Sequence, residues 1–288
     1  MERCVRDVET ALDGLLPPVA GPRGRVIDAM RYACLGGGKR LRPLLLLSTA
    51  ALFDAPAKSA LRAAAAIEMV HCYSLIHDDL PAMDDAELRR GRAAVHRQFD
   101  EATAILAGDG LLSLAFSVLA DPATDTDPAV RAELVGGLAR ASGPEGMVGG
   151  QMIDLSAERW SLDLTGITEL QRLKTGAMIA CACASGAILG RAGKEDRATL
   201  AGYADDLGLA FQIVDDLLDA EASTEALGKP AGRDSAAGKA TFVGQLGPAG
   251  ARDRAAALVD DAVGRLQRFG NGAETLCQIA RFVLERGH

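Results

Sequence analysis

Two clusters of aspartates have the residue type and the spacing with which proteins hold divalent cations. The first, DDLPAMDD, covers residues 78–85, and the second, DDLLD, covers residues 215–219. Each follows an apolar stretch with helical periodicity, where a bare carboxylate is disfavoured both by the dipole of the helix end and by desolvation. We therefore expect cations to compensate both clusters.

The spacing within each cluster indicates which carboxylates share a cation. Asp215 and Asp219 are four residues apart and so lie on one face of a helix. Asp78 and Asp84 are six apart, but Pro81 breaks the helix and lets Asp84 or its neighbour return toward the same cation. Mg²⁺ takes one or two carboxylates together with substrate phosphates. A solvated acidic helix end is the alternative for one cluster alone; two clusters in the same context favour a metal site whose substrate is a phosphate ester.

Basic residues that could bind such a phosphate are gathered in a few places. The turn GGGKRLRP at 36–43 opens a helix and carries three cations, and both helix N-termini and arginines bind phosphate. Its spacing is not that of a Walker A loop. Other candidates follow the first cluster, lie early in a predicted helix, or lie in an irregular segment at 221–239; they are Arg89, Arg90, Arg92, Lys174 with Thr175, Lys229 and Lys239. A plain surface charge is the alternative for any one of them, and charge balance with the adjacent aspartates is a further alternative for Arg89 and Arg90.

No pattern in the sequence indicates a protein nucleophile. The chain has no defensible Ser-His-Asp or Cys-His arrangement and no dinucleotide-binding fingerprint. His71 and His77 lie on an apolar helical stretch and can be explained as core residues. The six cysteines lack the four-ligand spacing of a zinc site, even at Cys181-x-Cys183, so reduced buried thiols are expected.

Helices must position these residues, because helical periodicity dominates the chain and no alternating β-branched run is long enough for a strand. We expect helices over residues 3–16, 25–35, 41–53, 57–77, 102–119, 129–142, 146–155, 168–189, 194–218, 249–269 and 273–285. The helix over 102–119 is expected to be interrupted at Gly108-Asp109-Gly110. No low-complexity linker divides the chain, which predicts one all-α domain.

Composition excludes some partners. The chain has 288 residues, 31 basic and 39 acidic, and its net charge of −8 gives no global attraction for nucleic acid or anionic membrane. The longest uncharged apolar stretch, 175–190, is shorter than the roughly 20 residues of a spanning helix and predicts a buried helix. The N-terminal stretch lacks the apolar core of a signal peptide. We expect a soluble cytoplasmic protein without a membrane span.

At these motifs the sequence resembles the trans-isoprenyl diphosphate synthase family, and it is most similar to the bacterial farnesyl diphosphate synthases of that family. The matching blocks run through nearly the whole chain: GGGKRLRP (36–43), HCYSLIHDDLPAMDDAELRRGR (71–92), EATAILAGD (101–109), GMVGGQMIDL (146–155), LKTG (173–176), GLAFQIVDDLLD (208–219) and LGKPAGRDSAAGKAT (227–241). The resemblance implies a single domain over 1–288 with the isoprenoid synthase fold, ten or more helices around a central apolar cavity.

The resemblance also implies a role for each matching residue. Three Mg²⁺ ions would be held by Asp78, Asp84 and Asp215, with Asp79 and Asp219 as further ligands. The diphosphate of an allylic substrate would contact Arg89, Lys174 and Lys229, with Thr175 and Gln212 nearby. The diphosphate of isopentenyl diphosphate would be bound by Lys39, Arg42, His71 and Arg90. Supporting or water-mediated contacts would come from Asp85, Gln151, Asp154, Asp216, Asp234 and Lys239.

The implied reaction is a head-to-tail condensation of isopentenyl diphosphate with dimethylallyl and then geranyl diphosphate, giving farnesyl diphosphate. Mg²⁺, Lys and Arg neutralise the departing diphosphate, and an allylic carbocation forms in a dry apolar cavity. The isopentenyl double bond attacks it and a proton is lost, so no protein nucleophile is required. Segment 221–239 would close over the site, and the family implies a homodimer.

Product length is expected to depend on the residues one turn before the first motif. Tyr73 and Ser74 lie five and four residues before Asp78, and a large Tyr would close the floor of the cavity. This favours the farnesyl product, with geranylgeranyl or geranyl diphosphate as the alternatives. Ala93-Ala94 and Val243 depart from the family, where Pro-Thr and Pro are common, and Asp85-Ala86-Glu87 also occurs in geranylgeranyl synthases. A terpene cyclase, a non-catalytic partner subunit of a heteromeric synthase and a helical bundle without activity are weaker alternatives, since both aspartate motifs are intact.

Overall fold

The computed structural model describes residues 2–156, 162–221 and 241–285, and these residues form helices with one very short hairpin, which confirms the all-α class. The chain divides into two compact units. Unit 1 comprises residues 1–138 and 188–191, and unit 2 comprises residues 139–187 and 192–288. The expected single domain over 1–288 stays a prediction.

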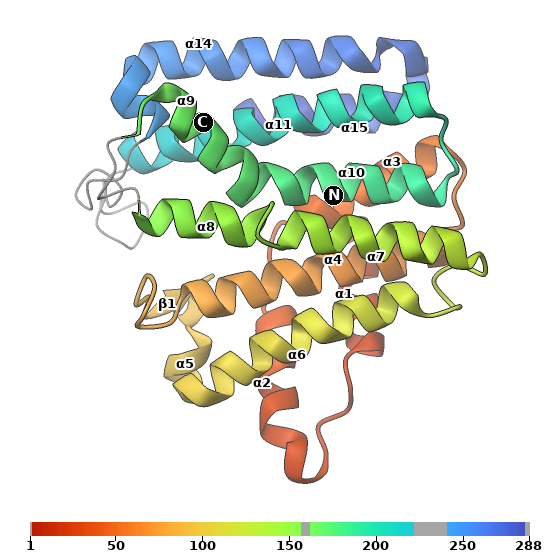
Figure 1. Ribbon diagram of the computed structural model, residues 1–288, viewed down its shortest axis with the longest axis vertical. Coiled ribbons are helices and arrows are strands. Elements are labelled where there is room, and N and C mark those ends of the chain that lie inside the picture. The colour runs from red at the N-terminus through yellow and green to blue at the C-terminus, as the bar shows by residue number, and fades with distance from the viewer. Residues whose placement is uncertain (1, 157–161, 222–240, 286–288) are drawn as a thin grey trace. The chain divides into compact units, whose positions relative to one another are not determined.

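Unit 1 is built around one long buried helix, α4, against which α1, α2, α3 and α6 pack (Figure 1). Its helices are α1 (Glu2–Leu15), η1 (Gly21–Arg23), α2 (Gly24–Cys34), α3 (Leu41–Leu52), α4 (Ala57–Asp78), α5 (Val95–Gln98), α6 (Glu101–Ala120) and the first part of α7 (Pro128–Ser142). Residues 63–66 of α4 are four consecutive buried alanines. Small side chains let neighbouring helices approach α4 closely, which positions the aspartates at its C-terminal end.

Helix α6 runs without a break through Gly108 and Gly110, so the expected interruption there is wrong. These glycines serve packing between helices. A Cβ atom at Gly108 would lie 2.1 Å from His77 Nε2, and one at Gly110 would lie 3.0 Å from Met30 Sδ. A larger residue at position 108 would therefore displace His77, the neighbour of Asp78.

A two-stranded antiparallel hairpin follows the first aspartate motif, although no strand was expected. It pairs β1 (Leu88–Arg89) with β2 (Arg92–Ala93). The two connecting residues, Arg90 and Gly91, have φ angles of 54° and 73°. Two residues with positive φ are typical of the tight turns that match the twist of a hairpin. With only two residues in each strand, the pattern is too short to detect by alternation.

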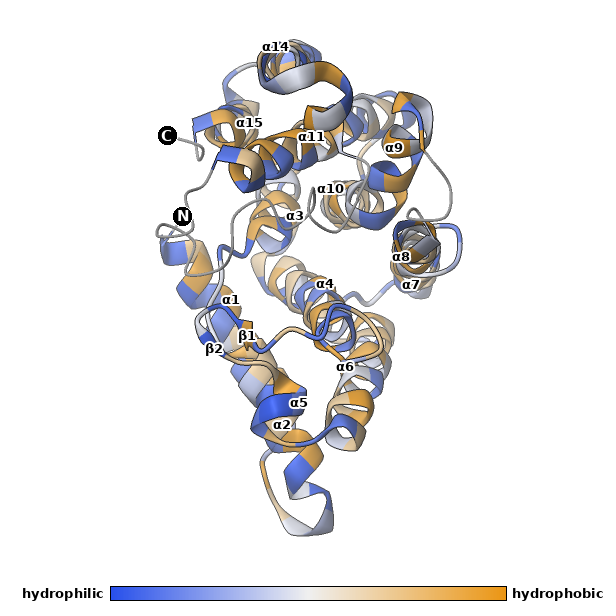
Figure 2. Ribbon diagram, turned by 90° about the vertical axis from the view of Figure 1, so that its left-hand side faces the viewer, coloured by the Kyte–Doolittle hydropathy of each residue, from blue (hydrophilic) through white to orange (hydrophobic). Residues whose placement is uncertain are grey.

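Unit 2 is organised around α11, which packs along α14 and also contacts α15 and the segment η2. Its elements are α8 (Met147–Ser156), α9 (Leu164–Gln171), the π-helix η2 (Arg172–Gly176), α10 (Ala177–Leu189), α11 (Lys194–Glu221), α14 (Phe242–Arg265), η3 (Leu266–Ala273) and α15 (Glu274–Glu285). Figure 2 shows both hydrophilic and hydrophobic residues along α15, whose buried side includes Leu276 and Ile279. Helix α14 is kinked at Gly247, whose φ of 69° and ψ of 163° are not helical, and Pro248 follows it, so the helix expected from residue 249 is the second part of α14. The first part was not expected, and the Thr241 hydroxyl caps it by accepting from Gly244 N at 3.1 Å.

Two helical stretches, Glu101–Ala120 and Leu164–Leu189, are long and apolar enough to cross a membrane by length and composition alone. The second is longer than the sequence suggested, because α9 and η2 lead directly into α10. Within it, 67% of the apolar window is buried inside the protein, which agrees with the expected buried helix. Buried core helices of globular proteins pass the same test.

Candidate active site

The first aspartate motif begins at the last residue of α4, and the chain then turns back on itself. Asp84 N donates to the carbonyl oxygen of Asp78 at 2.9 Å, and Ala86 N donates to that of Asp79 at 3.2 Å. Asp78 is half-buried and Asp84 is exposed. The return of the chain that Pro81 predicts is therefore present in the backbone, and it brings the main chain of Asp84 beside that of Asp78.

The second carboxylate of this motif, Asp79, contacts an arginine. Its side chain is 2% exposed and accepts from Arg89 Nε at 3.0 and 3.2 Å, with a further bond from Arg89 Nη2. Burial disfavours the charged form of Arg89, but the hydrogen bonds and charge of Asp79 outweigh it, so the pKa of Arg89 is raised. The guanidinium stays charged. The metal contact of Asp79 and the diphosphate contact of Arg89 stay predictions, since in this structure the two side chains contact each other.

The glycine-rich turn lies against the hairpin that follows the motif. Gly37 and Gly38 have φ angles of 79° and 133°, and the Arg90 guanidinium donates to the Gly37 carbonyl oxygen. A Cβ atom at Gly38 would lie 2.8 Å from Arg90 Cζ, so this position needs a glycine. Lys39 beside the turn is exposed, and Arg42 is half-buried in the first turn of α3.

Positive charge converges on His71, which lies about two turns before the end of α4. Burial lowers the pKa of His71 well below its ordinary value, and the charges of Arg42, Arg90, Arg40 and Arg89 lower it further. Four guanidinium groups thus act on one imidazole. A neutral histidine surrounded by fixed cations is a favourable place for an anion.

Arg40, one of the three cations in the glycine-rich turn, has a structural role. It is 2% exposed and donates to Glu68 Oε1 at 2.6 Å and to the Cys34 carbonyl oxygen at 2.6 Å. Glu68, a buried acid on α4, was missed in the sequence, where it is only one polar residue in an apolar helix. Arg90 Nη2 lies 3.9 Å from the same Glu68 oxygen. This carboxylate therefore balances part of the positive charge around His71.

The second aspartate motif lies within a continuous helix, because α11 extends to Glu221. The regular spacing places Asp215 and Asp219, both half-buried, on one helix face. Asp216 between them is 5% exposed and accepts from Phe242 N at 3.0 Å and from Gln212 Nε2 at 3.2 Å. Asp216 therefore ties α11 to the first residue of α14.

Lys174 and Thr175 lie on the π-helix η2 and not in the regular helix that was expected. π-Helical turns often occur at functional sites. Thr175 Oγ1 donates to Gln212 Oε1 at 3.1 Å, so η2 joins the chain of hydrogen bonds that leads to Asp216. Lys174 Nζ donates to Asp154 Oδ2 of α8 at 2.6 Å.

Two glycines allow the backbone of η2 to contact its neighbours. A Cβ atom at Gly150 of α8 would lie 2.3 Å from Lys174 N, and one at Gly208 of α11 would lie 3.0 Å from Gly176 Cα. The three segments are therefore in backbone contact. This contact explains why GMVGGQMIDL needs a glycine at position 150.

The residues expected to set product length lie side by side on α4. Tyr73 is buried, and its ring meets that of His77 edge to face, with centroids 5.7 Å apart. Ser74 Oγ donates to the His71 carbonyl oxygen at 2.8 Å and so stays along its own helix.

The predicted site residues fall into two sets, one in each unit. Unit 1 holds Lys39, Arg42, His71, Tyr73, Ser74, Asp78, Asp79, Asp84, Arg89 and Arg90, and unit 2 holds Lys174, Thr175, Gln212, Asp215 and Asp219. Lys229, Asp234 and Lys239 lie outside the described residues. Among the described residues, no group of three or more His, Cys, Asp or Glu side chains could hold a metal ion by itself.

Comparisons with known proteins agree on one family. A family model described as polyprenyl synthetase matches residues 24–269. A farnesyl diphosphate synthase of Geobacillus stearothermophilus is 43% identical over 98% of this chain and 95% of its own. A putative geranylgeranyl pyrophosphate synthase 8, chloroplastic, of Arabidopsis thaliana is 42% identical over 98% of this chain and 80% of its own. The crystal structure of an FPP/GFPP synthase from Zymomonas mobilis is 50% identical and superposes with a TM-score of 0.91, covering 98% of this chain and 97% of its own.

Proposed function

Because this chain belongs to the polyprenyl synthetase family, we propose that it condenses isopentenyl diphosphate head to tail with an allylic diphosphate. Dimethylallyl diphosphate is the first acceptor and geranyl diphosphate the second, so the product is farnesyl diphosphate. The similarity to a farnesyl diphosphate synthase extends over 98% of the chain, which supports the whole reaction and not a single motif.

The observation that carries this proposal is the arrangement within unit 1. An acidic helix end, with Asp84 returned to Asp78, is followed directly by a hairpin whose Arg90 docks on the glycine-rich turn. Four guanidinium groups also act on His71. Carboxylates for a cation and arginines for a diphosphate are the two sets of groups that chemistry on a diphosphate ester needs.

The carboxylates fit Mg²⁺ in their chemistry, because their oxygens are the ligands that hard cations take. Among the described residues, no group of three or more such side chains could hold a metal ion by itself. Mg²⁺ usually keeps several waters and is bound by one or two carboxylates plus substrate phosphates. Three ions are proposed, with Asp78 and Asp84 of unit 1 and Asp215 of unit 2 as ligands, and with Asp79 and Asp219 in addition. When bound, Mg²⁺ would neutralise charge on the departing diphosphate.

The cations divide between the two substrates. Arg89, Lys174 and Lys229 would bind the allylic diphosphate, with Thr175 and Gln212 beside them and Lys239 in support. Lys39, Arg42, His71 and Arg90 would bind isopentenyl diphosphate. Fixed cations stabilise negative charge as it develops on the leaving group. The allylic carbocation is then attacked by the isopentenyl double bond, and the proton lost from the adduct passes to the released diphosphate.

The buried position of Tyr73, one turn before Asp78, supports farnesyl as the product. A geranylgeranyl product is the second candidate, because a geranylgeranyl pyrophosphate synthase is 42% identical over 98% of this chain. A geranyl product and a non-catalytic partner subunit are weaker candidates. We further propose a cytoplasmic homodimer, as the family resemblance implies. It should not bind nucleic acid, because its net charge is −8. It should not span a membrane, because 67% of the apolar window in Leu164–Leu189 is buried.

The decisive experiment supplies isopentenyl diphosphate with dimethylallyl or with geranyl diphosphate, in Mg²⁺ or in EDTA, and measures the chain length of the products. We expect fifteen-carbon product from either acceptor in Mg²⁺ and none in EDTA. A twenty-carbon product would favour the second candidate. Absence of product from every pairing would overturn the proposed enzyme.

A further inference from the structure

Arg90 has a main-chain conformation that its own side chain does not secure. Its φ angle is 54°, in the left-handed region that a residue with a branched or long side chain rarely adopts. Such residues persist only where the surroundings fix them, and they gather at functional sites. The guanidinium donates to the Gly37 carbonyl oxygen and lies 3.9 Å from Glu68. The hairpin that carries Arg90 must therefore be held elsewhere.

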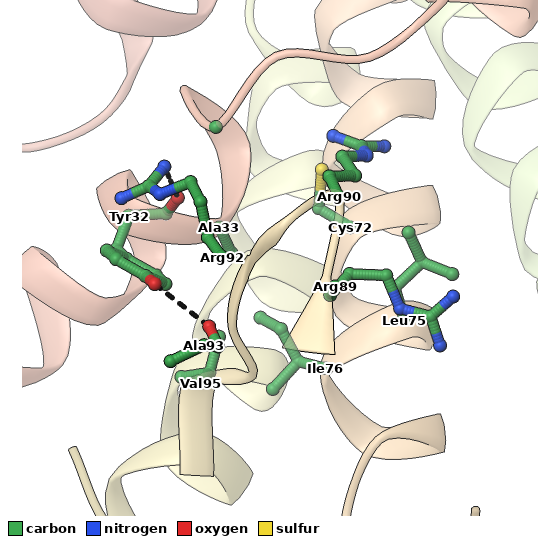
Figure 3. A pocket seen from close by; sticks show the side chains of 11 residues that line it. Tyr32, Ala33, Cys72, Leu75, Ile76, Arg89, Arg90, Arg92, Ala93 and Val95 are labelled. Atoms are coloured by element: carbon green, nitrogen blue, oxygen red, sulfur yellow. Dashed lines mark hydrogen bonds between the residues drawn. The ribbon is translucent and has the colours of Figure 1, made fainter. Parts of the chain in front are cut away.

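One aromatic residue of α2 holds the second strand of this hairpin at two consecutive residues. The Arg92 guanidinium carbon lies 3.8 Å from the centre of the Tyr32 ring, and Arg92 Nη1 donates to the Tyr32 carbonyl oxygen at 3.4 Å. The Tyr32 hydroxyl donates to the Ala93 carbonyl oxygen at 2.8 Å. Figure 3 shows Arg92 beside the Tyr32 ring and both hydrogen bonds. Phe99 supports the ring edge to face, with centroids 5.7 Å apart.

The glycine-rich turn packs closely against two arginines of the hairpin, Arg90 and Arg92. A Cβ atom at Gly36 would lie 2.8 Å from Arg92 Nη1, just as one at Gly38 would lie 2.8 Å from Arg90 Cζ. The side chains border a cavity of about 40 Å³ that Tyr32, Gly36, Arg90 and Arg92 help to line. A space of that size holds no more than a few water molecules. The contacts that the structure gives the Arg92 side chain are with Tyr32.

We propose that Tyr32 and Arg92 are positioning residues that fix the hairpin and thereby hold Arg90 ready for the diphosphate of isopentenyl diphosphate. The proposal rests on the proposed function, which assigns Arg90 to that substrate. Arg89 has a close support in the buried carboxylate of Asp79, whereas Arg90 lies 3.9 Å from the buried carboxylate of Glu68, which accepts from Arg40 at 2.6 Å. Loss of the Tyr32–Arg92 contact should therefore weaken the binding of isopentenyl diphosphate and leave the binding of the allylic substrate unchanged.

Steady-state kinetics with each substrate varied in turn test this selectivity. We expect Arg92→Ala and Tyr32→Leu each to raise KM for isopentenyl diphosphate about tenfold, while kcat and KM for geranyl diphosphate change less than about twofold. Tyr32→Phe keeps the ring and loses one hydrogen bond, so an increase of about threefold is expected. Arg92→Lys should not restore affinity, because an ammonium lacks the planar face that stacks on the ring. Arg25→Ala is the control, since Arg25 lies over the Phe99 ring and its guanidinium bonds to Asp100 and Thr103.

A double-mutant cycle separates positioning from direct binding. If Tyr32 and Arg92 act as one unit, the double variant Arg92→Ala/Tyr32→Leu should be no worse than either single variant. Full rescue by Arg92→Lys, additive effects, or an equal rise in both KM values would each overturn the proposal, and thermal unfolding of every variant shows which of them are folded. If Tyr32→Leu unfolds, Tyr32→Phe and Arg92→Lys still decide the question. An inactive wild type would refute the proposed function, whereas an active wild type with unchanged variants would refute only the positioning role.

Discussion

The two aspartate motifs reach a similar arrangement through different local structure. In unit 1, α4 ends at Asp78 and an irregular turn brings the backbone of Asp84 back to it. In unit 2, α11 continues through Asp215 to Glu221, and helical periodicity alone aligns Asp219 with Asp215. The first motif therefore depends on Pro81 and on the turn, whereas the second depends on an uninterrupted helix.

In both motifs the second aspartate, Asp79 or Asp216, is buried and contacts the protein. Asp79 contacts a cation, Arg89, whereas Asp216 accepts hydrogen bonds from neutral donors, Gln212 and the backbone of Phe242. A buried charge left without its partner is strongly destabilising, and a lost neutral hydrogen bond costs less. The comparison teaches that the second aspartate of each motif holds a different element in place: Asp79 holds the hairpin through Arg89, and Asp216 holds the first residue of α14 against α11.

The largest effect should come from removing a proposed metal ligand in either motif. We expect Asp78→Asn and Asp215→Asn each to lower kcat/KM about a thousandfold or more, because a metal ion supplies several kcal/mol of charge stabilisation in the transition state. The measurement is turnover at saturating Mg²⁺ with both substrates varied. Asp196→Asn, at the opposite end of α11, is the control and should retain activity. If only one of the two variants lost activity, the two motifs would not be equivalent in function.

Substitution of the second aspartate should have effects of different size in the two motifs. Asp79→Asn is expected to lower kcat/KM about a hundredfold and the free energy of unfolding by about 2 kcal/mol, because Arg89 loses a charged partner in a buried place. Asp216→Asn should cost only about tenfold, since an amide oxygen can still accept from Phe242 N. Urea unfolding and steady-state kinetics measure both effects. Equal losses in the two variants would contradict the larger cost expected where the Arg89 guanidinium loses its charged partner.

The sequence was sufficient where an interaction is local. The position of Pro81 between Asp78 and Asp84 predicts a return of the chain, and the structure has it. The spacing of Asp215 and Asp219 likewise needs only a helix. For Arg89, the alternative of charge balance with the adjacent aspartates matches the contact that the structure shows, because the two residues are only ten apart in the chain.

The sequence was insufficient where distant segments meet. Arg40 looked like one of three equivalent cations, and only the packing of α4 reveals Glu68, 28 residues away, as its buried partner. Gly108 looked like a helix breaker in the sequence. The reason for a glycine there is close packing against His77, which lies on another helix and has no local signal near position 108. The π-helix at Lys174 has no local signal either, since its neighbours meet it at Gly150 and Gly208. Such features depend on tertiary contacts and not on periodicity.

The two motifs also differ in the size of the side chain that lies about one turn before them, and we expect this difference to affect the length of the product. The residue five positions before Asp78 is Tyr73, whereas the residue five positions before Asp215 is Ala210, and both are buried. We expect Tyr73→Ala to lengthen the product by at least one five-carbon unit, because a smaller side chain would open the space one turn below the motif. Total turnover should stay within about tenfold, since no charged group is removed.

Product chain length, measured by chromatography after dephosphorylation, checks this prediction. Tyr203→Phe is the matched control, because Tyr203 is a buried tyrosine of α11 whose hydroxyl donates to the Leu276 carbonyl oxygen at 2.8 Å. Its product should remain that of the wild type. If Tyr73→Ala also stopped at the wild-type length, Tyr73 would not limit the chain.

The smallest effect concerns the charge around the first motif. The pKa of His71 is lowered by burial and then by four arginines, so the unfolded chain binds a proton at a pH where the folded protein does not. Stability should therefore be unaffected by His71 above its ordinary pKa of 6.5 and should fall as the pH drops below it. Between pH 6.5 and 5 this single group can remove no more than about 2 kcal/mol.

His71→Gln separates this contribution from the titration of all other groups. At pH 8 His71 is neutral in both the folded and the unfolded protein. The difference in free energy of unfolding between wild type and variant then gives the cost of the substitution alone. That difference should shrink as the pH falls toward 5, because only the wild type has to keep an uncharged imidazole among guanidinium groups. Urea unfolding at pH 8, 7, 6 and 5 provides the comparison. Parallel curves over this range would mean that burial and the four arginines together do not lower the pKa of His71 in the folded protein.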